Sequence, residues 1–175
     1  TTEVASMPGV VAVVTAEDVV LAAPRPRLPW IAAEMARPWL ATGRVRFVGE
    51  PVAVVVSETP DQGEDAAELV VVDYDPLDVV VDPEAALDPA APLIHGETNL
   101  ACEFLQDSPD PDLFAGCEVV VSGRTVNQRL AAAPLEGRAA AAVWDGERLT
   151  MWLSTQNAHS ARHAVAGALG LDRGD

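Results

Sequence analysis

The residues best suited to chemistry lie near the end of the sequence, in a Ser-Thr-Gln-Asn corner at residues 154–157. The pattern predicts that a strand ends and a helix begins here. The first main-chain N–H groups of a helix have no partner within it and can receive an anionic ligand. The amide of Gln156 adds a donor and an acceptor without adding charge. We expect Gln156 either to bind a ligand or to cap its own backbone.

Two further pairs of residues have spacings that could support a site. Glu136 and Arg138 are two residues apart, so on an extended chain they point to the same side. They are expected to form a buried charged pair that supports a site or, alternatively, an exposed pair of little energetic value. His159 and His163 share a helix face. Ser160 stands where a His-Glu-x-x-His zinc motif has glutamate, so solvated or capping histidines are expected.

The composition excludes several classes of protein. The 175 residues suffice for one large or two small domains, and 49% of them are hydrophobic, so the chain is expected to fold. The formal net charge is −16 and lysine is absent, which disfavours binding to nucleic acids and anionic membranes. The apolar runs are too short to span a bilayer. No P-loop, dinucleotide fingerprint, calcium loop or Gly-x-Ser-x-Gly motif is present.

The two cysteines indicate a reducing compartment. Cys102 and Cys117 form no Cys-x-x-Cys pair and no iron–sulfur or zinc spacing. We expect them to be buried thiols of a cytoplasmic protein. No signal peptide is visible and the sequence does not begin with methionine, so we expect a piece of a longer protein.

The first 88 residues are predicted to form an α+β module. Thr59 is a candidate N-cap, with Pro60 and acidic residues in the first turns of a helix that follows it. Gly49, Glu50 and Pro51 predict a turn. Strands are predicted at residues 9–15, 45–47, 52–56 and 70–74, and short helices at 16–21 and 82–86. A strand, a helix and a strand within about thirty residues are typical of a βαβ or split βαβ unit.

Residues 89–116 are rich in proline, aspartate and asparagine, which predicts a linker. A second module, residues 117–175, is expected to follow it. Asp145 and Gly146 predict a type I′ hairpin turn, and Gly170 is expected to end a helix at residues 158–169. Strands are predicted at residues 117–121, 123–130, 138–144 and 148–154.

With these elements in place, nearly the whole chain resembles a known family. Residues 44–87, RVRFVGEPVAVVVSETPDQGEDAAELVVVDYDPLDVVVDPEAAL, resemble the α/β-hammerhead of the molybdenum hydroxylase large subunits, which include xanthine dehydrogenase, aldehyde oxidase and carbon monoxide dehydrogenase. NQRLAAAPLEGR and STQNAHSARHAVAGALGL look like the start of the family's first molybdopterin-binding domain. The family's Pro-Met-Glu-Pro-Arg is Pro134-Leu135-Glu136-Gly137-Arg138 here, a form most similar to the carbon monoxide dehydrogenase-like large subunits.

The resemblance implies a function and a cofactor. It implies part of a molybdenum-dependent oxidoreductase whose electrons leave through iron–sulfur and flavin subunits or domains. Gln156 matches the family's glutamine beside the molybdenum, so it is the expected cofactor-binding residue for molybdopterin. The family's glycine-rich loop and its catalytic glutamate would follow Leu171. We therefore expect no catalytic residue and no metal ligand within this stretch, and neither activity nor bound cofactor for it alone.

Two alternatives to this interpretation stay open. The first is a non-catalytic assembly or docking module, because a fold does not by itself specify a function. The second is an acid–base hydrolase that would use Glu50 or Glu136, which is supported only by scattered carboxylates.

Overall fold

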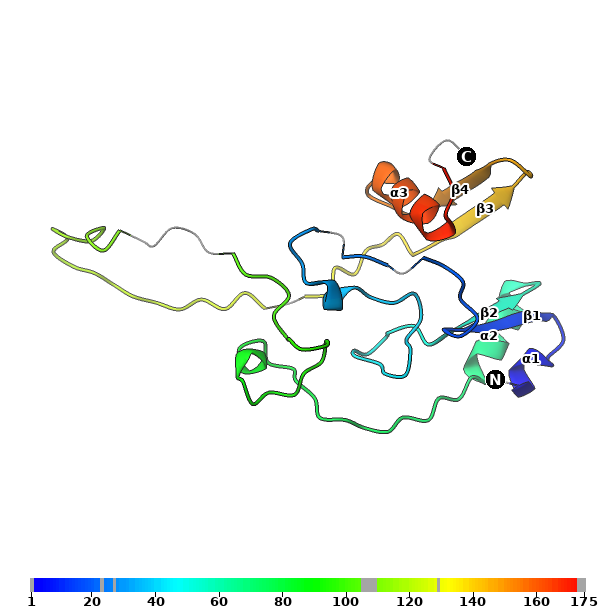
Figure 1. Ribbon diagram of the computed structural model, residues 1–175, viewed down its shortest axis with the longest axis horizontal. Helices are drawn as coiled ribbons and strands as arrows, with labels where there is room; N and C mark the ends of the chain where they lie inside the picture. The colour runs from blue at the N-terminus through cyan, green and yellow to red at the C-terminus, as the bar shows by residue number, and fades with distance from the viewer. Residues whose placement is uncertain (1, 23, 27, 105–109, 129, 173–175) are drawn as a thin grey trace. The chain divides into compact units, whose positions relative to one another are not determined.

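The chain divides into two compact units in a computed structural model that describes residues 2–22, 24–26, 28–104, 110–128 and 130–172 (Figure 1). The first unit comprises the described residues within Thr1–Glu103 and Ala164–Asp172, and the second lies within Phe104–His163. Helices and antiparallel strand pairs occur together, which confirms the predicted α+β class.

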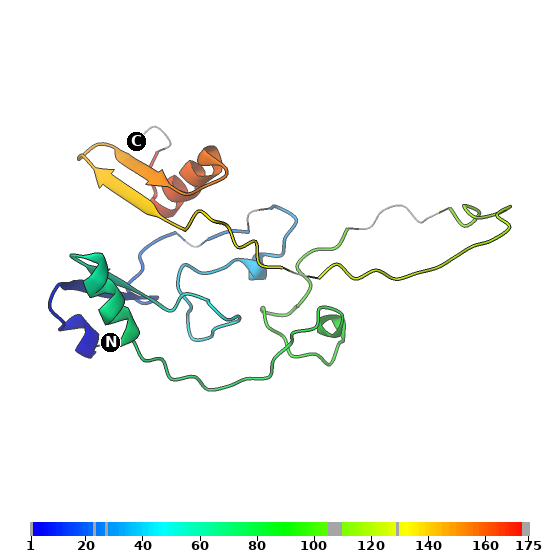
Figure 2. The ribbon, with the colours of Figure 1, turned by 180° about the vertical axis from the view of Figure 1, so that it is seen from behind.

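The first unit is built on an antiparallel pair of valine-rich strands, β1 (Val10–Thr15) and β2 (Ala53–Ser57). The register runs from Val10 opposite Ser57 to Thr15 opposite Ala53, with an irregularity between Val10 and Ala12. Two helices lie against this pair, α1 (Thr2–Ala5) and α2 (Pro60–Glu68), and Figures 1 and 2 show α2 beside the strands. The buried apolar side chains of the unit include Val4, Leu40 and Ala66.

The start of α2 confirms the predicted cap. Thr59 is extended, and its hydroxyl accepts a hydrogen bond from the main-chain N–H of Gln62 at 3.4 Å. Pro60 occupies the first helical position, where the missing N–H costs nothing, and Asp61 lies at the positive end of the helix dipole. The order β1, β2, α2 replaces the expected βαβ unit, because residues 70–74 pair with no other strand in the part of the chain that the structure describes.

Three other expectations for this unit were wrong. Residues 16–18 form a turn, not a helix, because the Asp18 carboxylate accepts from both the main-chain N–H and the hydroxyl of Thr15, at 2.8 Å each. The same bonds lower the pKa of Asp18. Residues 45–47 are not a strand, since they enter a turn that the side chain of Glu50 holds. In place of the short helix predicted at residues 82–86 there is only a 3-10 turn, η2 (Ala85–Leu87). A second 3-10 turn, η1 (Ala33–Met35), lies earlier in the chain.

The second unit contains a hairpin of β3 (Ala140–Trp144) and β4 (Leu149–Leu153), as predicted. The prediction of a type I′ turn between these strands was wrong. Residues 145–148 form a four-residue loop in which Gly146 alone has a positive φ, of 105°. The carboxylate of Asp145 closes the loop by accepting from the main-chain N–H groups of Glu147 and Arg148, at 3.0 and 2.7 Å.

The helix after the hairpin, α3 (Ala158–Leu169), has the predicted bounds and the predicted end. Gly170 takes a φ of 69°, and the N–H of Leu171 donates to the carbonyl of Ala166 at 2.9 Å. This is the pattern in which a left-handed glycine closes a helix. The described parts of residues 117–121 and 123–130 form no strands, and Arg129 lies outside the described residues.

Many apolar side chains are exposed, and the thiols are less buried than expected. Cys102 is half-buried and Cys117 is exposed, and both are free, so a buried position was the wrong prediction for Cys117. Val71, Val79 and Val81 are between 79% and 91% exposed along an extended segment. In the described residues, no helix has the length and the apolar content that crossing a membrane requires.

Candidate functional site around Gln156

The polar corner is joined to the preceding segment by hydrogen bonds of Ser154. The hydroxyl of Ser154 accepts from the N–H of Ala139 at 3.2 Å and donates to the carbonyl of Gly137 at 2.9 Å. The N–H of Ser154 donates to the carbonyl of Ala139 at 3.0 Å. These three bonds hold residues 137–139, where the Pro-Leu-Glu-Gly-Arg segment (residues 134–138) ends, beside the corner that carries Gln156.

The neighbours of Gln156 meet the hydrogen-bonding needs of the corner. Asn157 caps α3, because its side-chain oxygen accepts from the N–H of Ser160 at 2.9 Å. The hydroxyl of Thr155 accepts from the N–H of Asn157 at 3.2 Å. Gln156 itself is exposed, and its amide makes no hydrogen bond to any residue in the described ranges. The structure therefore gives the capping role to Asn157 and leaves the donor and the acceptor of Gln156 available.

Glu136 and Arg138 are not a buried pair. Both residues are exposed, and no ion pair joins them within the described part of the chain. The expectation of a buried charged pair was wrong, and the exposed alternative describes them better. The bonds of Ser154 reach only main-chain atoms, of Gly137 and Ala139, and do not involve these two charged side chains.

His159 and His163 share a face of α3, as their spacing predicts. The Nδ1 atom of His163 lies 2.9 Å from the carbonyl oxygen of His159, which is a local contact within the helix. Over the residues that the structure describes, no group of three or more histidine, cysteine, aspartate or glutamate side chains could hold a metal ion.

Two features of the site were not predicted. Ser154 was placed in the polar corner, but its bonds to residues 137 and 139 depend on the strand pairing, which the sequence shows only in outline. Ala133 has a φ of 41°, in the left-handed region, where a Cβ atom is unfavourable. No signal in the sequence marks Ala133, because strained alanines arise where the surrounding structure imposes them.

Comparison with known proteins identifies the two parts of the chain. Residues 1–78 match the aldehyde oxidase and xanthine dehydrogenase a/b hammerhead domain, and residues 95–175 match the molybdopterin cofactor-binding domain. The chain belongs to the molybdenum hydroxylase large subunits of this family. The resemblance expected from residues 44–87 and from the Thr-Gln corner is thereby confirmed, and Gln156 lies in the part that matches the cofactor-binding domain.

Individual family members agree with this assignment. The chain is 38% identical over 143 residues to the nicotine 6-hydroxylase large subunit of Paenarthrobacter nicotinovorans, a match that covers 79% of this chain and 17% of that protein. It is 34% identical over 194 residues to the carbon monoxide dehydrogenase large chain of Afipia carboxidovorans, covering 98% and 23%. The aldehyde oxidoreductase of Desulfovibrio gigas has the same fold, with a TM-score of 0.84 and 26% identity over 99% of this chain and 20% of that one.

The chain thus spans about a fifth of the length of these relatives. Two relatives are subunits of larger enzymes by name. They are the nicotine 6-hydroxylase large subunit and the 6-hydroxypseudooxynicotine dehydrogenase complex subunit gamma, both of Paenarthrobacter nicotinovorans. The match of residues 95–175 to a molybdopterin cofactor-binding domain supports molybdopterin as the cofactor of the intact protein, and residues 1–78 match the hammerhead.

Proposed function

We propose that this chain acts within a molybdenum-dependent hydroxylase of the carbon monoxide dehydrogenase and aldehyde oxidase type, in which Gln156 binds the molybdopterin cofactor. The observation that carries the proposal is the amide of Gln156. It is exposed and without a partner among the described residues, at a corner whose main chain is already capped by Thr155 and Asn157.

The donor set of the corner fits an oxygen-rich cofactor. An amide can donate to one oxygen atom and accept from another donor of the same group. Because it carries no charge, it also avoids the repulsion that a carboxylate would add in a chain of net charge −16. The cofactor, when bound, supplies the redox chemistry that oxidises the substrate, while the protein holds and orients it. Within this chain, Gln156 is the residue that would make the hydrogen bonds.

The proposal extends to the surroundings of the chain. Iron–sulfur and flavin subunits or domains are the partners that would carry electrons away from the cofactor. We place the hammerhead module at residues 1–88, a linker at 89–116 and the start of the cofactor-binding domain at 117–175. The match of separate family domains to residues 1–78 and 95–175 supports a division in this region. The two free cysteines support a cytoplasmic location.

The test replaces Gln156 in the longest natural protein that contains this sequence. Molybdenum and pterin are measured after purification, together with turnover on carbon monoxide, an aldehyde and an N-heterocycle. Gln156→Ala is expected to lower turnover or cofactor content without lowering the melting temperature. Glu147→Ala, which truncates an exposed side chain at the far end of the same hairpin, is the matched control. An unaltered Gln156→Ala protein would contradict the role of this residue, and a purified protein without molybdenum or pterin would favour the docking module instead.

A further inference from the structure

We propose that Ser154 is a positioning residue that fixes the place of Gln156, a role that rests on the function proposed above. The two residues are separated by one position, at the corner that follows β4. Ser154 makes three hydrogen bonds to residues 137 and 139, whereas Gln156 makes none within the described structure. The anchored residue and the residue available to a ligand are therefore near neighbours.

The hydroxyl of Ser154 replaces a main-chain group in the strand ladder. In the register of β3 and β4, Ala140 lies opposite Leu153, so one further step places Ala139 opposite Ser154. In a regular antiparallel ladder, two residues at a hydrogen-bonded position form two main-chain bonds, because the N–H of each donates to the carbonyl of the other. Here the N–H of Ser154 donates to Ala139, but the N–H of Ala139 donates to the side-chain oxygen of Ser154.

This substitution ends the hairpin and begins the corner. Because the side chain satisfies the N–H of Ala139, the carbonyl of Ser154 is released from the ladder and the main chain can turn toward Thr155. The hydroxyl proton goes to the carbonyl of Gly137 at 2.9 Å, so the donor and an acceptor site of the hydroxyl are both used. Without the hydroxyl, the N–H of Ala139 can pair with the main-chain carbonyl of residue 154 and extend the ladder. The corner, and the amide of Gln156 with it, would then shift.

The experiment compares Ser154→Ala, Gln156→Ala and the double variant in the longest natural protein, loaded with its cofactor. The measurements are kcat and KM separately, the fraction of molybdenum and pterin lost on prolonged dialysis, and the melting temperature. Removing an interaction of hydrogen-bond strength is expected to lower kcat or speed cofactor loss about fivefold to tenfold in Ser154→Ala. In the Gln156→Ala background the same change should have an effect of less than about twofold, because residues that act together are not additive.

Two controls separate positioning from folding. Ser154→Thr keeps a hydroxyl and should restore most of the cofactor retention. Ser57→Ala removes a hydroxyl that donates to the carbonyl of Thr59 at 2.8 Å in the other unit, and it should leave cofactor retention unchanged. If Ser154→Ala yields no folded protein, Ser154→Cys takes its place, since a thiol is a weak hydrogen-bonding group.

The outcomes distinguish this inference from the function on which it rests. An undiminished effect of Ser154→Ala in the Gln156→Ala background overturns the inference alone, as does a loss of melting temperature with kcat and cofactor retention unchanged. A Ser154→Cys protein with full kcat and full retention overturns it too. If Gln156→Ala itself changes neither cofactor content nor turnover, the proposed function of Gln156 fails and the inference fails with it.

Discussion

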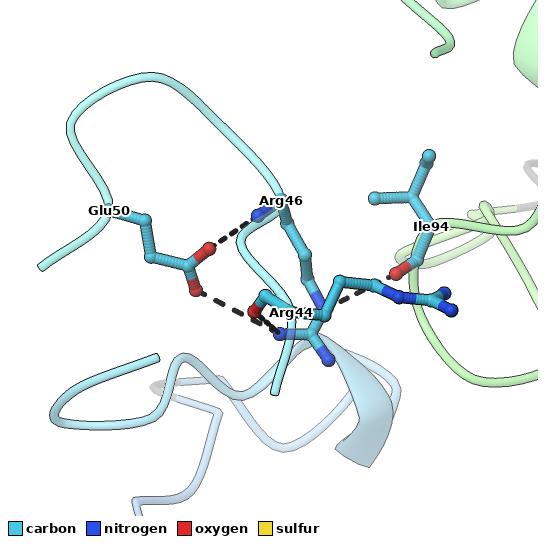
Figure 3. Close-up of polar contacts among 4 residues, drawn as sticks. All are labelled: Arg44, Arg46, Glu50 and Ile94. Carbon is cyan, nitrogen blue, oxygen red and sulfur yellow. Dashed lines mark hydrogen bonds and ion pairs between the residues drawn. The ribbon is translucent and has the colours of Figure 1, made fainter. Parts of the chain in front are cut away.

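The carboxylate of Glu50 accepts a hydrogen bond from the main-chain N–H of Arg46 at 2.5 Å, and its other oxygen lies 3.9 Å from the guanidinium of the same residue (Figure 3). The side chain of Glu50 is 3% exposed. The Nε atom of Arg46 donates in turn to the carbonyl of Ile94 at 3.3 Å. Glu50 thus holds a turn, and Arg46 joins that turn to a segment far along the chain. A carboxylate engaged in this way is unsuited to acid–base hydrolysis.

Removing the Glu50 side chain should destabilise the first unit. In Glu50→Ala the N–H of Arg46 loses its partner, at a cost of about 1–3 kcal/mol in the free energy of unfolding. Glu50→Gln keeps an acceptor oxygen and should cost less. Urea unfolding would measure both, with Glu58→Ala, at an exposed position, as the control. Equal stabilities of the Glu50→Ala and Glu58→Ala proteins would show that the turn does not depend on this carboxylate.

The cap of α2 offers a test confined to a single hydroxyl. Thr59→Ala leaves the N–H of Gln62 without its capping acceptor and should lower the stability of the first unit by about 1 kcal/mol. Thr59→Ser keeps the capping oxygen and should retain most of that stability. Thermal unfolding followed by circular dichroism separates the two variants. A Thr59→Ser protein as unstable as Thr59→Ala would mean that the methyl group, and not the cap, matters.

Because Ala133 has a positive φ, replacing it with glycine should change the stability in the opposite direction from the same replacement at Ala132. Glycine tolerates a positive φ, so Ala133→Gly relieves a penalty of about 1–2 kcal/mol, partly offset by the greater entropy of glycine in the unfolded chain. Ala132 has no positive φ, so Ala132→Gly should only destabilise, by about 0.5–1 kcal/mol. The relevant measurement is the difference in unfolding free energy between the two variants. A loss at residue 133 as large as that at residue 132 would contradict the strained conformation.

The hairpin loop should weaken in acid. Hydrogen bonds from the N–H groups of Glu147 and Arg148 lower the pKa of Asp145 below its ordinary value of 3.8. A carboxyl whose pKa is lower in the folded state stabilises that state fully above the ordinary value, and this contribution is lost as the pH falls through the lowered pKa. The fluorescence of Trp144 on β3 and Trp152 on β4 should report a loss of hairpin structure below pH 3.8. Asp145→Asn should abolish this part of the pH dependence while keeping a side-chain acceptor, and an unchanged acid response would contradict the assignment.

The elements that were predictable are those with a local chemical signal. Thr59 and Pro60 mark the start of α2, Asp145 and Gly146 mark the hairpin loop, and Gly170 marks the end of α3. The failures are strands that need a distant partner. Residues 70–74 are rich in valine, but a ladder requires a second strand, and the sequence does not show whether one is present. The pattern therefore predicts the capacity to form a strand, while pairing decides whether it forms.

The candidate site divides in the same way. Gln156 could be singled out from the residue type and from the family resemblance, and its role stays a prediction. The bonds of Ser154 could not be foreseen, because they depend on the register that places residue 139 opposite residue 154. The type of turn was missed for a similar reason. The Asp145 carboxylate satisfies two N–H groups in a four-residue loop, and a two-residue turn offers no place for that arrangement.

The exposed side chains of Val71, Val79 and Val81 make this protein prone to aggregate in solution. At neutral pH each molecule carries a net charge of −16, and electrostatic repulsion keeps the exposed valine segments of different molecules apart. Salt shortens the reach of that repulsion to about 10 Å at 0.1 M, and acid removes the charge itself. We therefore expect the protein to stay in solution in mildly alkaline buffer of low ionic strength. It should aggregate when salt is added or the pH is lowered, unless another protein surface covers these valines.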